Sequence, residues 1–291
     1  MTPSRGETTM TRPNLVKTMP EAAVSLACFS VLSYLLTSGC GGMTGLGAAC
    51  LLLVGGAAVA WSLGPEAGRR LWRVLTALGV GLGVFSLFRF AGLVQWPVGR
   101  PDSLRSYLFM LYSHVVLSAT ILATVLWGAY GKGARGNGIG PIRFGQWLRW
   151  QPGRVAGTLL IVVAAAAWFW AGGAVASTRP SVPAAAWAFV GVAVAKACLT
   201  GLTEEVCYRG VVQTAAIARF GVVAGILYQA CLYAAFHVGL GPVFFGPLGF
   251  VATIFALGLV FGSVTRLTSG IGWACVVHIA LDVIVEWQNV S

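Results

Sequence analysis

The feature that most constrains this chain is its series of long apolar runs with almost no charge. Residues 48–61 and 159–170 carry no polar alternation, whereas strands of a membrane barrel alternate apolar and polar residues. A spanning helix needs about 20 mostly apolar residues. The runs therefore predict an all-α, polytopic transmembrane helical bundle of about eight to nine spans. The candidate spans are residues 22–38, 43–63, 74–95, 107–130, 155–177, 184–201, 220–238, 246–265 and 271–288.

Composition supports the membrane assignment. Only 9% of the 291 residues are charged and 57% are hydrophobic, whereas an ordinary soluble domain has about 25% charged residues. This composition excludes a soluble globule, a disordered chain, a collagen and a coiled coil. The seven cysteines show no CxxC or CxxxC spacing. We interpret them as small apolar residues and not as a disulfide framework or a zinc ribbon.

The basic residues predict the orientation. The net charge is +11, and the Lys and Arg residues gather in the short connections between apolar runs, which favours a topology signal over nucleic-acid binding. With a cytoplasmic N-terminus, 14 of the 19 fall inside and three outside. We expect a multi-pass protein of a bacterial inner, or plasma, membrane. Its parts would be a cytoplasmic tail (1–21), transmembrane helices without motifs (22–177) and a C-terminal transmembrane core (178–291) that contains the motifs described below.

Acidic residues and histidines cluster near the C-terminus. Ionisable side chains inside a membrane are costly, so each one is a candidate site. Four acids, Glu7, Glu21, Glu66 and Asp102, fall in expected tails or loops and are most simply solvated charges. The other four acids and two of the three histidines fall in the last 90 residues: Glu204, Glu205, His237, His278, Asp282 and Glu286.

Spacing assigns helix faces within this cluster. Glu205 and Arg209 are four residues apart, so on a helix they share a face and can form an ion pair. The Glu204 side chain then points about 100° away from that of Glu205 and can contact groups other than Arg209. His278 and Asp282 are also four residues apart. These residues also have non-functional interpretations. The Glu pair could be a charge cluster at the membrane end of a helix, and the histidines could be core residues whose hydrogen bonds are made within the protein.

Counting along the chain predicts the depth of two of these residues. Glu204 lies 16 residues before Phe220, and His237 lies 17 residues after it. On antiparallel helices that turn near Phe220, these separations are about 24 and 26 Å, so the two side chains can lie at one level. This requires 203–218 to continue as a helix. The simple span limits instead place Glu204 at the inner edge and His237 near the outer edge.

Together the motifs carry a family resemblance. Glu-Glu-x-x-x-Arg at 204–209, Tyr-x-x-x-His at 233–237 and His-x-x-x-Asp at 278–282 resemble those of the CPBP family, over residues 184–288. That family comprises intramembrane proteases related to type II CAAX prenyl endopeptidases, together with bacteriocin-processing and immunity proteins. Tyr233 stands where the family usually has Phe, and Asp282 where Asn is common.

The resemblance implies hydrolysis of peptide bonds inside the membrane, with a Glu and a His activating water. On this basis Glu204, His237, His278 and Asp282 are the expected catalytic residues, and Glu205 and Arg209 support them. Independently of the resemblance, an apolar site makes a carboxylate a competent base near neutral pH. The sequence contains no Gly-x-Ser-x-Gly and no His-Glu-x-x-His motif, so the serine and standard zinc mechanisms lack their residues.

We expect no cofactor, although Glu204, His237 and His278 could in principle supply a three-ligand zinc site. The expected partners are a membrane-associated protein or peptide substrate and the lipid bilayer. Two other functions stay open. One is a non-enzymatic membrane immunity or partner-binding protein, and the other is a proton-coupled transporter that uses the Glu and His residues as a relay.

Overall fold

The computed structural model describes residues 15–37, 66–94, 104–130, 186–237 and 246–290. All regular secondary structure in these ranges is helical, as the sequence predicts. The elements are α1 (Leu15–Thr37), α3 (Glu66–Phe90), α4 (Leu104–Tyr130), α6 (Ala186–Glu204), the π-helix η2 (Glu205–Val212), α7 (Gln213–Phe220), α8 (Val222–His237), α9 (Gly246–Thr268) and α10 (Gly272–Val290).

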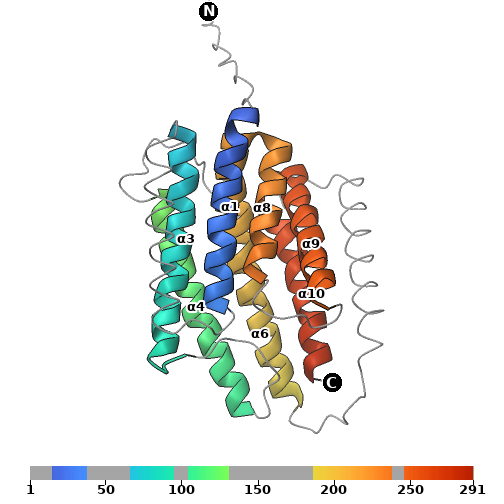
Figure 1. Cartoon of the computed structure of the whole chain (residues 1–291). Coiled ribbons are helices and arrows are strands. Elements are labelled where there is room, and N and C mark those ends of the chain that lie inside the picture. The colour runs from blue at the N-terminus through green and yellow to red at the C-terminus, as the bar shows by residue number, and fades with distance from the viewer. Residues whose placement is uncertain (1–14, 38–65, 95–103, 131–185, 238–245, 291) are drawn as a thin grey trace, which may run out of the picture.

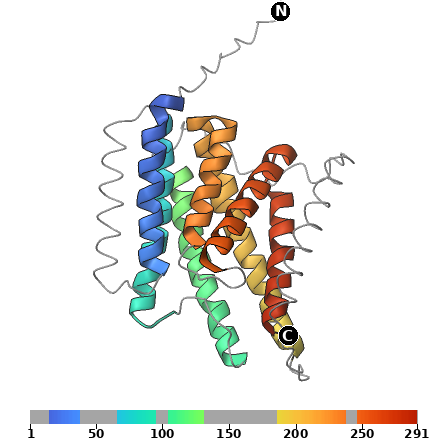
Figure 2. The same ribbon diagram turned by 45° about the vertical axis from the view of Figure 1, so that its right-hand side comes forward.

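The helices run side by side as a bundle (Figures 1 and 2). α3 pairs with α4 at one side, and α9 packs against α8 and α10 at the other. α8 contacts α1, α7 and α9, while α6 contacts α4 and α10. α8 therefore lies in the middle of the bundle, and most residues of its C-terminal half are buried.

Several described helices are apolar enough for a membrane. Arg69–Phe90, Leu104–Tyr130 and Gly249–Thr268 have the length and hydropathy to cross one, and Met19–Val31, Val222–His237 and Gly272–Val285 are shorter apolar stretches. These helices are those of an integral membrane protein. The expected spans 43–63 and 155–177 lie outside the described residues, so the total of eight to nine stays a prediction.

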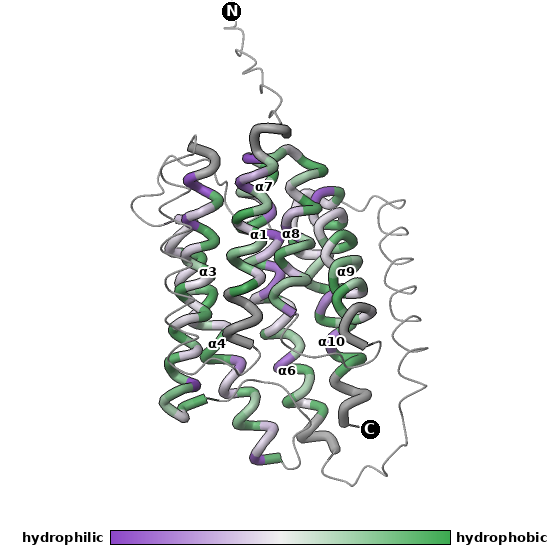
Figure 3. The backbone as a smooth tube through the Cα atoms, in the orientation of Figure 1, coloured by the Kyte–Doolittle hydropathy of each residue, from purple (hydrophilic) through white to green (hydrophobic). Residues whose placement is uncertain are grey.

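The bundle has apolar side chains on its surface, and its largely apolar interior encloses a few charged and polar groups. Large apolar side chains such as Trp127 and Val223 are exposed on its surface, whereas Glu205, Arg209 and Gln229 are fully buried. Colouring by hydropathy shows hydrophobic residues along most of every described helix (Figure 3). Since burying charge is expensive unless it is paired, these interior groups mark the part of the molecule that carries chemistry.

One unbroken helical rod positions the first motif. α6, η2 and α7 follow each other without a gap from 186 to 220, a length of about 50 Å at 1.5 Å per residue. The expectation that 203–218 continues as a helix is confirmed. The helix does not end at the expected span limit of 201, because a hydropathy window stops at the Glu204–Glu205 pair although the helical backbone continues.

The rod reverses at a tight turn into α8. Gly221 ends α7 with a φ of 86°, which is the left-handed region that favours glycine. Gly225 then allows α8 to pack closely against α7. Any larger residue would clash here, because a Cβ at this position would lie 2.6 Å from the backbone nitrogen of Ile217. This hairpin aligns η2 and α8 as close antiparallel neighbours, which sets the depth of the residues on both.

α1 is fastened to the same hairpin. The hydroxyls of Ser25 and Tyr228 lie 2.7 Å apart, and the Arg219 guanidinium pairs with the Glu21 carboxylate. The expectation that Glu21 is a solvated charge in a tail is therefore wrong. α1 begins at Leu15, seven residues before the expected first span, and this extension carries Glu21 to Arg219.

Candidate functional site

Glu204 and His237 face each other across the interior of the bundle. Glu204 ends α6 and His237 ends α8, and Glu204 Oε2 lies 3.9 Å from His237 Nε2. The hairpin count along the chain is therefore confirmed, and the alternative that places the two residues at opposite edges of a span is wrong. The physical reason is that the helix continues past Glu204 to Phe220, which moves the turn 16 residues away.

The π-helix turns two adjacent carboxylates toward one imidazole. Glu204 Oε2 lies 3.6 Å from His278 Nε2, and Glu205 Oε1 lies 2.8 Å from His278 Nδ1. In an α-helix neighbouring side chains diverge by about 100°, whereas the wider π-turn that starts at Glu205 changes this relation. π-helical segments are rare and occur frequently at functional sites.

Arg209 neutralises the deeper carboxylate. Its Nη1 lies 2.9 Å from Glu205 Oε1, and both side chains have an exposed fraction of 0%. The guanidinium carbon lies 4.2 Å from the centre of the Tyr233 ring and 5.0 Å from that of Phe261, so the cation lies between two aromatic rings. The predicted Glu205–Arg209 contact is present, and the pair is sealed inside the bundle.

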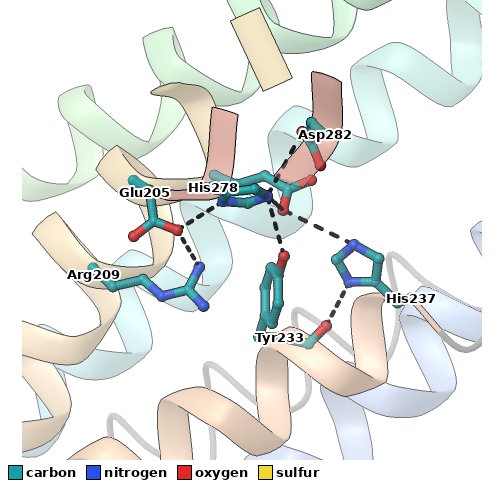
Figure 4. A network of polar contacts seen from close by, with 7 residues as sticks. Glu205, Arg209, Tyr233, His237, His278 and Asp282 are labelled. Carbon is teal, nitrogen blue, oxygen red and sulfur yellow. Dashed lines mark hydrogen bonds and ion pairs between the residues drawn. The ribbon is translucent and has the colours of Figure 1, made fainter. Parts of the chain in front are cut away.

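His278 is held from three directions (Figure 4). Nδ1 donates to Glu205 Oε1, because a carboxylate only accepts. The ring stacks on Phe261, with centroids 5.0 Å apart and an angle of 20° between the planes. Nε2 is therefore directed at Glu204, at Asp282, whose Oδ2 lies 3.7 Å away, and at the Tyr233 hydroxyl.

The group that orients this imidazole does not come from its own helix. Asp282 lies four residues after His278 on α10, so the spacing places the two residues on one helix face. The hydrogen bond that fixes Nδ1 comes instead from Glu205 on η2. Asp282 approaches only Nε2, at a distance longer than a hydrogen bond. It lies beside the Nε2 edge of the ring and not beside Nδ1.

His237 is oriented by its own helix. Its Nδ1 lies 2.8 Å from the carbonyl oxygen of Tyr233, so Nδ1 carries the hydrogen and donates it. In the neutral ring, Nε2 is then an acceptor that faces Glu204. The rings of Tyr233 and Phe236 pack on it with centroids 4.6 and 5.3 Å away. The motif spacing of four residues thus produces the hydrogen bond that sets the tautomer.

Exposure distinguishes two sides of the site. The exposed fraction of the side chain is 29% for Asp282, 13% for Glu204 and 11% for His237, against 0% for Glu205 and Arg209. Oε2 of Glu204 itself is buried and has no hydrogen-bond partner in the described residues. Glu204, His237 and Asp282 are therefore the partly exposed groups of the site, and the Glu205–Arg209 pair is its fully buried part.

Two aromatic residues of the site were not expected to take part. Tyr233 entered the sequence analysis only as a motif position, yet its hydroxyl lies 3.4 Å from His278 Nε2. Phe261 on α9 carried no signal, although it stacks on His278 and lies against Arg209. The spacing from Tyr233 to His237 could have placed the Tyr233 ring near the site. Nothing in the sequence around Phe261 distinguishes it from other apolar residues of α9.

Comparison with protein families identifies the part of the chain that holds the site. Residues 185–284 match the family model described as type II CAAX prenyl endopeptidase Rce1-like. The chain is therefore similar to this family over about a third of its length, and the matched segment covers every residue of the candidate site, from Glu204 to Asp282. No curated protein and no solved structure matches the chain.

The described residues of the matched segment offer no set of ligands that the spacing alone marks as a metal site. No group of three or more His, Cys, Asp and Glu side chains there has the arrangement that holds a metal ion. Glu204, His237 and His278, the candidate zinc ligands, do converge. Zinc requires ligands at about 2.0–2.2 Å in a tetrahedron, and the bond from His278 Nδ1 to Glu205 leaves the Nε2 atom of His278 facing Glu204.

Proposed function

We propose that this protein is an intramembrane glutamic-type endopeptidase that hydrolyses peptide bonds of membrane-associated proteins. The observation that carries the proposal is the position of the Glu204 carboxylate, which is held in the interior of an apolar bundle and faces His237 and His278 at 3.9 and 3.6 Å. The match of residues 185–284 to a type II CAAX prenyl endopeptidase family supports a protease. Neither the immunity function nor the transporter function is favoured by a specific contact.

In this mechanism Glu204 is the general base. A water molecule between Glu204 Oε2 and His237 Nε2 would donate one hydrogen to each, because both atoms are acceptors in the resting site. Glu204 takes a proton as the water oxygen attacks the scissile carbonyl carbon, and it later returns that proton to the leaving amine. His237 keeps the water aligned, since its own ring is fixed by the Tyr233 carbonyl.

His278 would stabilise the charge that develops on the carbonyl oxygen, and Asp282 would act only through His278. As an imidazolium, His278 donates Nδ1–H to Glu205 and directs Nε2–H at the oxyanion. The carboxylate of Asp282 beside Nε2 favours the charged ring. The fixed Glu205–Arg209 pair keeps the imidazole in place during the reaction, so that no reorganisation is needed as charge develops.

The substrate would be a membrane-associated protein or peptide. Candidate classes are prenylated C-terminal tails, bacteriocin leaders and C-terminal sorting anchors. Each class places its scissile bond near a membrane, which suits a base at the end of α6 between apolar helices. The family description makes prenylated tails the first class to test.

The test uses the full chain purified into lipid nanodiscs and quenched fluorescent peptides of these three classes. We expect cleavage by the wild type and a loss of at least 1,000-fold in Glu204→Gln, which keeps the shape of the side chain but removes the base. Glu21→Gln is the matched control, because it makes the same change in the α1–α7 ion pair away from the site. Retained cleavage in Glu204→Gln, or ion-coupled uptake without cleavage, would contradict the proposal.

We also propose that hydrolysis needs no metal. A zinc enzyme would lose its activity on dialysis against a strong chelator and would carry about one zinc per chain in elemental analysis. We expect full cleavage after dialysis and substoichiometric zinc. Activity that disappears with the chelator and returns with added zinc would instead assign Glu204, His237 and His278 as ligands.

A further inference from the structure

Tyr233 places a hydroxyl in the middle of the charged groups of the site. Its Oη lies 3.4 Å from His278 Nε2. The other two groups that approach this nitrogen are carboxylates, Glu204 at 3.6 Å and Asp282 at 3.7 Å. Among these three groups, Tyr233 alone can donate a hydrogen bond while both acids are ionised.

The ring of Tyr233 is held so that this hydroxyl has one position. The Arg209 guanidinium lies over its face at 4.2 Å from the centroid, and the Tyr208 ring packs against it edge-on at 5.3 Å. The His237 ring lies 4.6 Å from it. The residue is fully buried. A hydroxyl on a ring with these contacts is preorganised, which is the condition for efficient electrostatic catalysis.

The hydrogen of this hydroxyl is only weakly engaged in the resting site. The separation of 3.4 Å exceeds the usual range of about 2.5–3.2 Å for hydrogen bonds of hydroxyl and N–H groups. Long contacts in a free enzyme often shorten when the substrate or transition state is bound. The Tyr233 hydrogen is therefore available for an oxygen atom that enters the space beside Nε2.

The charge balance of the reaction calls for such a donor. Attack on the scissile carbonyl creates an oxyanion. Glu204 and Asp282 both lie near His278 Nε2, the nitrogen expected to donate a hydrogen bond to this oxyanion. Asp282 stays ionised, so it repels an oxyanion and only accepts hydrogen bonds, and the proton that Glu204 takes from the water is kept for the leaving amine. We propose that Tyr233 is a further catalytic residue whose hydroxyl, together with His278 Nε2–H, donates a hydrogen bond to the oxyanion. This inference rests on the proposed endopeptidase function.

The step leaves Tyr233 unchanged. The water oxygen forms a bond to the carbonyl carbon, its proton passes to Glu204, and the π-electron pair of the carbonyl moves to oxygen. Tyr233 donates a hydrogen bond to that oxygen and keeps its proton. When the intermediate collapses, the carbonyl re-forms, the C–N bond breaks and Glu204 returns the proton to the amine.

The experiment compares Tyr233→Phe with the wild type in nanodiscs. Phe keeps the ring contacts and removes only the hydroxyl. We expect kcat to fall about 100- to 1,000-fold, as for the loss of one oxyanion donor, with KM changed less than threefold. A peptide with a phosphinate in place of the scissile amide should lose affinity by a similar factor, because its tetrahedral oxygens mimic the oxyanion.

Tyr228→Phe is the matched control. It removes a buried hydroxyl from the same helix, but this hydroxyl pairs with Ser25 of α1 and not with the site. We expect its kcat to equal that of the wild type. A second prediction links two positions: Asp282→Asn in the Tyr233→Phe background should restore kcat at least tenfold, because it places an amide donor beside His278 Nε2.

The outcomes separate the inference from the function on which it rests. If Glu204→Gln is inactive while Tyr233→Phe keeps more than a third of the wild-type kcat and its phosphinate affinity, the inference is overturned and the endopeptidase stands. If the wild type cleaves none of the peptides, both fall. Should Tyr233→Phe fail to fold, 3-fluorotyrosine at 233 provides the test: a more acidic donor must raise phosphinate affinity, and an unchanged affinity overturns the inference.

Discussion

Arg209 is the residue on which the folded site most depends. It is the cation next to the fully buried Glu205 carboxylate, and it also contacts the rings of Tyr233 and Phe261. Removing one partner of a buried pair leaves an uncompensated charge, at a cost of about 3–5 kcal/mol. We expect Arg209→Ala to lose both stability and cleavage, as measured by thermal unfolding in detergent and by the peptide assay.

A double variant checks that reason. Glu205→Gln combined with Arg209→Met removes both charges and leaves neutral side chains of similar volume, which can be as stable as the pair itself. We expect this protein to unfold at a higher temperature than Arg209→Ala but to stay inactive, because Glu205 no longer holds His278 Nδ1. A double variant as unstable as the single one would show that packing, and not charge, explains the loss.

Asp282 has a weaker effect in our mechanism. Its carboxylate is 29% exposed and approaches His278 Nε2 only at 3.7 Å. We expect Asp282→Asn to keep at least a third of the wild-type kcat, since an amide can donate where the carboxylate repels the oxyanion. Asp282→Ala, which has no donor, is the comparison and should be slower. Complete inactivity of Asp282→Asn would mean that the charge itself is required.

At the scale of elements, the α7–α8 hairpin sets the depth of the site. A Cβ at Gly225 would lie 2.6–2.8 Å from atoms of Ile217, so Gly225→Ala must push the helices apart. Overpacking of this kind costs about 1–3 kcal/mol. We expect a lower unfolding temperature and at least tenfold slower cleavage, because His237 on α8 moves away from Glu204 on α6.

Gly191 provides the control for that change. It lies on α6, and a Cβ there would meet nothing within 4 Å. We expect Gly191→Ala to be neutral or slightly stabilising, since Ala favours a helix more than Gly does. Equal effects of the two substitutions would indicate that glycine matters through helix propensity and not through the close approach of α7 and α8.

The elements also show where sequence reasoning stops. The apolar runs predicted the helices, and the 16- and 17-residue separations from Phe220 predicted that Glu204 and His237 share a level, which the 3.9 Å contact confirms. The switch from α6 to a π-helix at Glu205 was not predicted. A π-turn leaves no periodic signature within eight residues, and it is stabilised here by contacts to α10 and α8 far along the chain.

At the scale of the whole molecule, the basic residues predict that the N-terminus is cytoplasmic. The pairing of Glu21 with Arg219 puts the α7–α8 turn at the same end of the bundle. We expect a small epitope tag at residue 1 to be digested by added protease in inside-out vesicles and protected in intact cells. A tag inserted between residues 98 and 99 should behave in the opposite way, and the reverse pattern would contradict the charge count.

The sequence by itself determined the class of the protein, the helix faces and the set of charged residues, because apolar length and four-residue spacing are local properties of a chain. The tertiary structure decided the partners. Glu205 and His278 are 73 residues apart, and Tyr233 and His278 are 45 apart. Contacts between residues so distant depend on how helices pack and turn against each other. For this reason the spacing could place Asp282 on the same helix face as His278. Only the packed bundle shows that Glu205 binds Nδ1 of His278 and that the Tyr233 hydroxyl lies near its Nε2.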